Sequence, residues 1–101
     1  MSNLDKFYVG DTPLILVDCV KDISGFSLVE ILAIKPSGAT ETFDVTVLND
    51  ENSGLPRFLE YQTLAGDLDE VGEWKFHSHV VISGMDLHGE VATQEIFALG
   101  T

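Results

Sequence analysis

The clearest strand pattern in the chain lies at residues 73–82, which read EWKFHSHVVI. Apolar and small side chains alternate with polar ones along this segment. One set holds Trp74, Phe76, Ser78, Val80 and Ile82, and the other set holds Glu73, Lys75, His77 and His79. Because successive side chains of a strand point to opposite faces, this period of two indicates a strand with one buried face. We therefore predict a long strand here, with Trp74 and Phe76 in the centre of the core.

The same pattern continues on both sides of this segment, and turn residues interrupt it at short intervals. Apolar or alternating runs occupy residues 14–20, 28–35, 42–48, 57–63 and about 89–99, with turns at 36–38 and 83–86. Long helical patterns do not alternate with these runs, which excludes α/β architectures. We predict an all-β, antiparallel β-sandwich of seven to nine strands, formed by a single domain that spans residues 1–101.

Residues 64–72 separate two of the predicted strands and are too short for a full helix. They suit one helical turn, in which Asp67 caps the start, Glu70 completes a capping box and Gly72 ends the turn in a left-handed conformation. The same carboxylates, with Asp69, are also a candidate calcium site, as is the acidic loop 49–52. Capping and hydration explain both groups without a metal, and we favour that interpretation.

The composition limits the possible functions. The chain has 101 residues, of which 45% are hydrophobic, and its net charge is −12 from 17 acidic and five basic residues. The hydrophobic content excludes a disordered chain. The negative charge disfavours binding to nucleic acid or to an anionic membrane. We interpret the charge as a source of solubility, and a docking face for a basic partner is the alternative.

Motifs that would indicate catalysis are missing from the sequence. It contains neither a nucleophile elbow, nor a phosphate-binding loop, nor a dinucleotide fingerprint. The single cysteine, Cys19, lies in an apolar run, which favours a small buried side chain over a catalytic thiol. We therefore predict a protein that is not an enzyme and that uses no cofactor.

Three histidines are the weak candidates for a metal site. His77 and His79 lie on the same face of the predicted strand, roughly 7 Å apart, and His88 follows the predicted hairpin. Three imidazoles can bind zinc. A row of polar side chains that face the solvent explains the same spacing equally well, so we predict no metal site.

Three aromatic residues are candidates for contact with a partner. Phe7, Tyr8 and Phe26 lie near the ends of predicted strands or in loops, where an exposed apolar side chain marks an interface. Phe26, which follows Gly25, is the strongest of the three.

Several short segments together resemble small virion proteins of tailed bacteriophages. The matching segments are FYVGDT (7–12), DISG (22–25), IKPSG (34–38), YQT (61–63), GDLDEVGEW (66–74) and HGE (88–90). The chain is similar to the immunoglobulin-like N-terminal domain of baseplate upper proteins. The resemblance implies an immunoglobulin-like sandwich in a structural virion component that is made in the host cytoplasm and assembled in symmetric copies.

The resulting hypothesis is a structural adaptor in the tail, baseplate, neck or fibre attachment of a phage. Its partners are other virion proteins, and it forms a symmetric homo-oligomer in the particle. Strand addition at sheet edges, including the terminal segments 1–8 and 97–101, is the expected mode of contact. A capsid decoration (cement) protein is the close alternative. A carbohydrate- or metal-binding module and a regulator that sequesters a basic host protein are alternatives from other classes.

Overall fold

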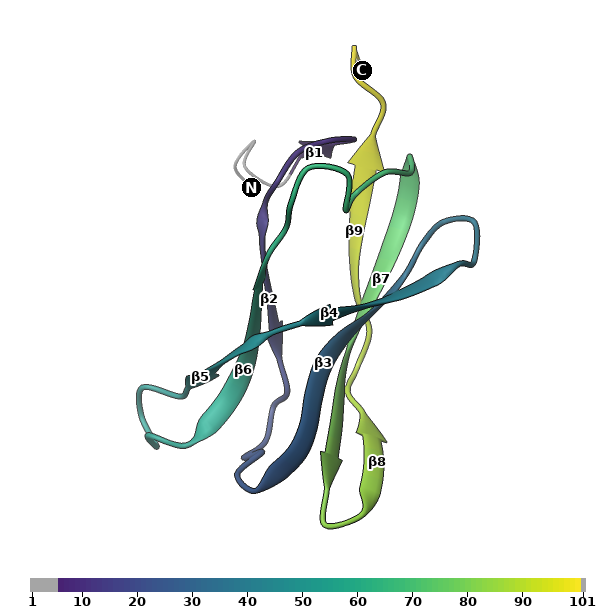
Figure 1. Cartoon of the computed structure of the whole chain (residues 1–101). Coiled ribbons are helices and arrows are strands. Elements are labelled where there is room, and N and C mark those ends of the chain that lie inside the picture. The colour runs from purple at the N-terminus through teal and green to yellow at the C-terminus, as the bar shows by residue number, and fades with distance from the viewer. Residues whose placement is uncertain (1–5, 101) are drawn as a thin grey trace.

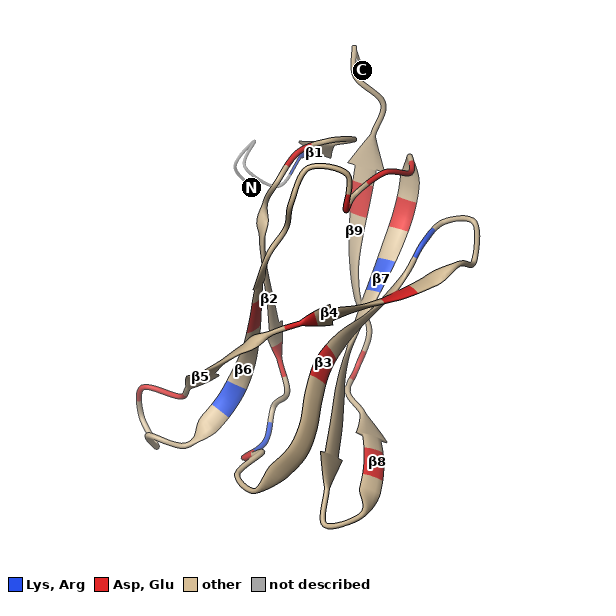
Figure 2. Ribbon diagram, viewed as in Figure 1, with Lys and Arg blue, Asp and Glu red and all other residues tan. Residues whose placement is uncertain are grey.

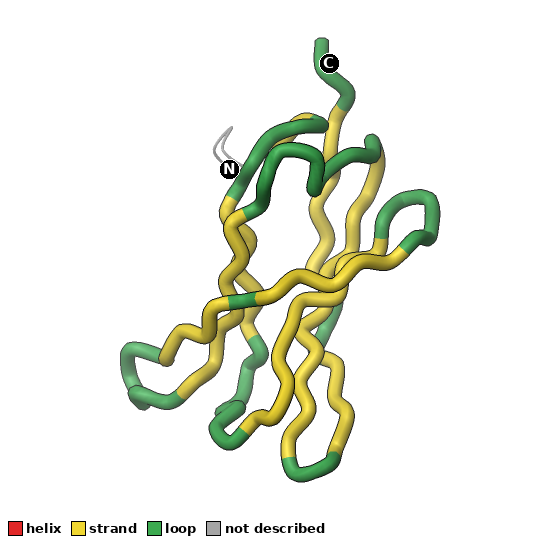
Figure 3. Tube along the Cα trace, in the orientation of Figure 1, coloured by secondary structure: helices red, strands yellow, loops and turns green. Residues whose placement is uncertain are grey.

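A computed structural model describes residues 6–100, and this part of the chain consists of strands joined by turns and loops, without any helix (Figures 1 and 3). The strands are β1 (Phe7–Tyr8), β2 (Leu14–Asp18), β3 (Phe26–Ile34), β4 (Thr40–Asp44), β5 (Thr46–Asn49), β6 (Pro56–Gln62), β7 (Gly72–Ile82), β8 (Met85–His88) and β9 (Ala92–Phe97). The all-β prediction is confirmed. The part of the terminal segments at residues 1–5 and 101 lies outside the described residues.

The strands form two sheets. The large sheet has the order β1-β9-β7-β3-β4, with β8 also paired to β7, and the small sheet has the order β2-β6-β5. All neighbouring strands are antiparallel except β1 and β9, which are parallel. The prediction of a purely antiparallel fold is therefore wrong for β1 and β9. These strands are far apart in the sequence and no hairpin joins them, so no turn forces them to run in opposite directions.

Within residues 6–100 the chain crosses from one sheet to the other four times, between β1 and β2, β2 and β3, β4 and β5, and β6 and β7. β4 and β5 are separated only by Val45, yet β4 pairs with β3 in the large sheet and β5 with β6 in the small sheet (Figure 1). Likewise, β1 belongs to the large sheet and β2 to the small one. The single strand predicted at residues 42–48 is thus two strands. The alternation of inward and outward side chains continues from β4 through Val45 into β5, because the inward side chains of both strands face the same core.

The core lies between the two sheets. Its buried side chains are Val17, Cys19, Ile23, Ile31, Ala33, Phe43, Leu59, Leu68, Trp74, Phe76, Val80 and Ile96. Burial of each large apolar side chain stabilises the fold by about 1.5–3 kcal/mol. Trp74 is fully buried, and its Nε1 donates a hydrogen bond of 2.8 Å to the carbonyl of Glu70. The stacked rings of Phe43 and Tyr61, with centroids 4.4 Å apart, join the large sheet to the small one.

The predicted long strand is confirmed as β7, with Trp74 and Phe76 buried, and it lies in the middle of the large sheet. β7 pairs with β3 along one edge and with both β8 and β9 along the other. Ser83 and Gly84 have positive φ and form the two-residue turn between β7 and β8, the geometry that matches the twist of a hairpin. The predicted last strand, at about residues 89–99, is the shorter β9, and a further strand, β8, occupies residues 85–88, of which 85 and 86 were predicted as turn.

The predicted helical turn at residues 64–72 is not found. The segment forms successive turns, in which the amide of Leu64 donates a hydrogen bond to the Asp67 carboxylate. Glu70 does not complete a capping box, because its carboxylate accepts hydrogen bonds from the amide and hydroxyl of Ser37. Gly72 does have a positive φ of 129°, and a Cβ at this position would lie 2.8 Å from the Pro36 side chain. Packing of two turns against each other therefore replaces a helix here.

Acidic residues are spread over both sheets and several loops, and basic ones are few (Figure 2). Within residues 6–100 there is no helix of the length and apolarity needed to cross a membrane.

Candidate functional site

Three neighbouring strands of the large sheet bring imidazole and carboxylate groups together on its outer face. Across the β3–β7 pair, Glu30 lies opposite His79, and across the β7–β8 pair, His79 lies opposite His88. Asp86 lies two residues before His88, on the same face of β8. The inner face of β7 is buried in the core, so its period of two directs these polar groups outward. We call Glu30, His79, Asp86 and His88 the histidine cluster.

His79 is held between two carboxylates. Its Nδ1 lies 2.7 Å from Glu30 Oε2, and its Nε2 lies 2.5 Å from Asp86 Oδ1. The side chain of His79 is only 15% exposed, and that of Glu30 is 20% exposed. The hydrogen bond to Glu30, followed by that to Asp86, raises the pKa of His79 above its usual value, because both carboxylates favour the imidazolium.

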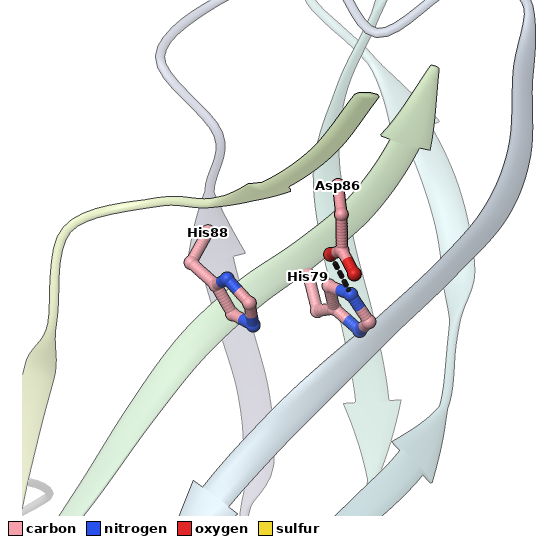
Figure 4. Close-up of side chains that lie close together, drawn as sticks. All are labelled: His79, Asp86 and His88. Atoms are coloured by element: carbon pink, nitrogen blue, oxygen red, sulfur yellow. Dashed lines mark hydrogen bonds and ion pairs between the residues drawn. The ribbon is translucent and has the colours of Figure 1, made fainter. Parts of the chain in front are cut away.

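The ring of His88 stacks on the ring of His79, with centroids 4.5 Å apart and planes inclined by 4°. Figure 4 shows the two rings beside each other and the Asp86 carboxylate at the Nε2 edge of His79. One ligand atom each from His79, Asp86 and His88 lies within 4.8 Å of the others. The arrangement therefore gathers two nitrogen donors and one oxygen donor at the surface, a set that suits transition-metal ions.

His77 is the member of the predicted histidine trio that lies outside this group. Its Nδ1 is hydrogen-bonded at 2.8 Å to the carbonyl of Gly89, so it holds the segment that follows β8. The metal-ligating group contains Asp86 in its place. The sequence carried a signal for Asp86, since Asp86 and His88 are two residues apart and share a face. Glu30 had no such signal, because only the register of β3 with β7 brings it to His79.

A second candidate site is the outer face of the small sheet. Leu14 and Leu16 of β2 are 54% and 57% exposed, and they alternate with Ile15 and Val17, which face the core. On the same outer face lie Phe58 of β6, opposite Asp18, and Leu48 of β5, opposite Phe58. We call Leu14, Leu16, Leu48 and Phe58 the apolar face.

The apolar face has a charged border at one end. Arg57 donates hydrogen bonds to both oxygens of the Asp18 carboxylate and a further one to Asp50. The hydrogen bond from Arg57 holds the pKa of Asp18 below its usual value. The pKa of Asp50 is also lowered, first by the amide of Asn52 and then by Arg57. Asp50, Asn52 and Arg57, with Leu16, Leu48 and Phe58, line an open groove of about 430 Å³.

A groove of about 370 Å³ runs along the other side of β2. Its wall includes Phe7, Leu14, Leu16, Phe76 and Ala92, so it lies between β2 and β9. β2 is the last strand of the small sheet, and within residues 6–100 no strand pairs with its outer edge. A strand edge beside an apolar groove is a template for the addition of another strand.

The three aromatic residues predicted as partner contacts occupy different places. Phe7 is half-buried and lines the groove beside β2. Tyr8 is half-buried against Phe97, with ring centroids 6.2 Å apart. Phe26 is 37% exposed at the start of β3, which belongs to the large sheet and not to the sheet of β2. The fold therefore does not gather them into one surface, and only Phe7 adjoins the groove. Leu14 and Leu16, which are exposed on β2, were not predicted from the sequence as partner contacts.

The other groups considered from the sequence have structural partners. The carboxylates of the 64–72 segment point to different neighbours: Asp67 accepts from Tyr61, Asp69 from Lys35 and Glu70 from Ser37. Cys19 is buried, as predicted, and burial raises the pKa of its thiol.

Comparison with protein-family models, curated proteins and solved structures finds no match to this chain. The resemblance to phage virion proteins therefore stays a prediction, and no family is assigned. Function is accordingly argued from the histidine cluster and from the apolar face with the adjoining edge of β2.

Proposed function

We propose that the chain is a non-enzymatic assembly domain that binds neighbouring protein subunits through β2. In this proposal it serves as an adaptor in the tail, baseplate, neck or fibre attachment of a tailed phage, and capsid decoration is the alternative role. The occupant of the site is a strand from a neighbouring virion protein or from another copy of the chain.

The observation that carries the proposal is the mismatch between the sequence of β2 and its place in the sheet. Residues 14–17 read LILV and are apolar on both faces, which is typical of a central strand covered on two sides. β2 is instead an edge strand, and Leu14 and Leu16 are more than half exposed. Apolar side chains on an open strand edge are a liability in a protein that acts alone. They are suited to a surface that another protein covers.

The mode of binding follows from the chemistry of this edge. An added strand gains main-chain hydrogen bonds from β2, and its alternate side chains enter the apolar groove that Phe7 and Ala92 line. The other side chains of the added strand extend the apolar face beside Leu16. Glu60 lies between Leu16 and Thr46 across the small sheet, so a basic residue in the partner would complement this face.

An immunoglobulin-like fold is part of the proposal, and the strand order supports it. The sequence β9-β7-β3-β4 in the large sheet corresponds to strands G, F, C and C′ of the immunoglobulin fold. The sequence β2-β6-β5 in the small sheet corresponds to strands B, E and D. The virion role itself is supported by the resemblance of turn and core segments of this chain to virion proteins of tailed phages.

Quantitative mass spectrometry of purified particles tests the virion role. The sample is the tailed phage whose genome encodes the chain, and its major capsid and tail-tube proteins give the reference copy numbers. A ring-scale copy number is expected for an adaptor, and a capsid-scale number would instead identify a decoration protein. Complete absence from particles would overturn the virion role and favour a cytosolic regulator.

A pair of substitutions tests the site. Leu16→Lys places a charge on the apolar face, and Val71→Lys places the same charge at a residue of similar exposure, 53%, in the turn before β7. We expect Leu16→Lys to abolish incorporation into particles while Val71→Lys is incorporated normally. Equal incorporation of both variants, with both folded by circular dichroism, would exclude β2 as the binding edge.

A further inference from the structure

We propose that His79, Asp86 and His88 bind a divalent transition-metal ion, with zinc as the best-fitting one, and that Glu30 positions His79 for this role. The inference is independent of the assembly role, because the histidine cluster lies on the large sheet and the proposed binding edge lies on the small sheet.

The donor set selects the class of ion. Two imidazoles and one carboxylate are ligands that zinc and its neighbours in the first transition series prefer, whereas calcium and magnesium take oxygen ligands. His79 and His88 face each other across β7 and β8, and Asp86 lies diagonally opposite His79, so the register of this two-strand unit fixes their spacing. Zinc sites with three protein ligands leave a fourth position open, and the solvent-exposed side of this group provides it.

Glu30 supplies the contact that orients a ligating histidine. A carboxylate accepts hydrogen bonds, so the contact of 2.7 Å with Glu30 Oε2 keeps the proton on Nδ1 of His79. Nε2 is then the ring nitrogen that faces Asp86 and is the donor atom for the metal. Such a carboxylate–histidine–metal arrangement fixes the tautomer and the ring orientation.

The distances require a small closure of the cluster around the ion. Ligand atoms at about 2.0–2.2 Å from zinc in a tetrahedron are about 3.3–3.6 Å from one another. Atoms of the group that are as much as 4.8 Å apart must approach by roughly 1 Å, whereas His79 Nε2 and Asp86 Oδ1, which are 2.5 Å apart, must separate by nearly 1 Å to admit the ion. Asp86 is 67% exposed and His88 is also exposed, so these two side chains can turn toward the better-buried His79. In this closure the metal replaces the proton between His79 Nε2 and Asp86.

Calorimetric titration of the full chain with zinc chloride, after removal of metals with a chelator, tests the proposal. We expect one saturable site per chain and a melting temperature that rises with zinc, because the ion binds the folded chain. His88→Gln and Asp86→Asn should each abolish saturable binding. Glu30→Gln, which replaces the charged acceptor of the positioning contact with a neutral amide, should weaken the affinity by about 10- to 100-fold.

Two control substitutions separate this site from adventitious binding. Glu90→Gln removes a charge close to His88 in the sequence, outside the cluster, and should leave zinc affinity within about twofold of the unmodified chain, as surface changes away from a site do. His77→Gln should also retain one saturable site, because His77 is hydrogen-bonded to Gly89 and meets His88 only through an edge-on ring contact, with centroids 6.4 Å apart. A loss with His77→Gln as large as that with His88→Gln would overturn the ligand assignment.

Cobalt provides a second readout. The visible spectrum of the cobalt-loaded chain should show d–d bands of a nitrogen and oxygen ligand set, without the thiolate charge-transfer band that binding to Cys19 would add. Absence of saturable binding to the unmodified chain, or equal binding by all variants, would overturn the proposal.

Discussion

The outer faces of the two sheets differ in what they present to the solvent. On the large sheet, His79 is hydrogen-bonded to Glu30 and to Asp86 across neighbouring strands. On the small sheet, Leu14 and Leu16 are more than half exposed at an edge strand. The first face satisfies its polar groups within the chain, and the second leaves apolar surface that another chain can cover.

One small fold can therefore present two kinds of candidate site on its outer faces. Inward residues of both sheets share the core, so the outer faces are free to differ. A polar cross-strand row suits an ion, and an apolar edge suits a protein strand. Four substitutions test this difference between the two outer faces, from the largest expected effect on stability to the smallest.

The largest effect is expected for Gly89→Ala, which perturbs the large sheet. A Cβ at residue 89 would lie 2.2 Å from Ser78 Oγ, inside the sheet. We expect a loss of about 1–3 kcal/mol in the free energy of unfolding, measured by urea denaturation, because the buried Ser78 must move. Zinc affinity should fall as well, because residue 89 follows His88 directly.

Ser78→Ala provides the control for this substitution. It removes the clashing oxygen, and the remaining Ser78 Cβ would be 3.5 Å from the new atom, which is an ordinary contact. The double variant should therefore be more stable than the sum of the two single changes predicts. If the two single changes in the free energy of unfolding simply add in the double variant, the clash between residue 89 and Ser78 is not the cause of the lost stability.

The second change, Tyr61→Phe, weakens the join between the sheets on which both faces depend. It keeps the ring that stacks on Phe43 and removes the hydroxyl that donates a 2.6 Å hydrogen bond to Asp67. We expect a loss of about 1 kcal/mol at neutral pH by urea denaturation. A loss of several kcal/mol would mean that the ring itself has shifted.

The pH dependence of this loss has a definite sign. The hydrogen bond to Asp67 raises the pKa of Tyr61 to about 12. A group whose pKa is higher in the folded state stabilises the fold fully below its unfolded pKa, about 10 for tyrosine, and the stabilisation is lost as the pH rises through the folded value. The stability difference between the unmodified chain and Tyr61→Phe should therefore shrink between about pH 10 and pH 12.

The third change, Arg57→Gln, acts at the charged border of the apolar face. Asp18 and Asp50 have lowered pKa values in the folded chain, so they stabilise it above their unfolded pKa of about 3.9. This contribution is lost as the pH falls through the folded values. Arg57→Gln should lower the urea midpoint at pH 7, and the difference should narrow below about pH 4. An equal difference at both pH values would exclude these ion pairs as its cause.

The smallest effect on stability is expected for Leu16→Ser. Because Leu16 is 57% exposed, the change should alter the free energy of unfolding by less than about 0.5 kcal/mol. Retention on a hydrophobic-interaction column should decrease, since apolar surface is removed. A loss above about 1 kcal/mol in the free energy of unfolding would show that Leu16 packs within its own chain. That result would contradict the proposal that a partner covers the apolar face.

The local pattern of residues was enough to predict that the fold is all-β and which side chains of β7 face the core. Alternation in residues 73–82 predicted β7, its buried Trp74 and Phe76, and the outward direction of His77 and His79. The apolar surroundings of Cys19 predicted its burial. These features depend on the period of two, which is a local property of the chain.

Which strands lie beside each other depends on tertiary contacts between distant segments of the chain. The register of β3 and β8 on β7 brings Glu30 and Asp86 to His79 and leaves His77 with Gly89. The turn of residues 36–38 packs against residues 64–72, so that segment does not become helical. Likewise, LILV has the pattern of a central strand, yet the sheet order makes β2 an edge. Contacts between distant segments set all these outcomes, because a local pattern specifies which face is buried and not which strand lies beside it.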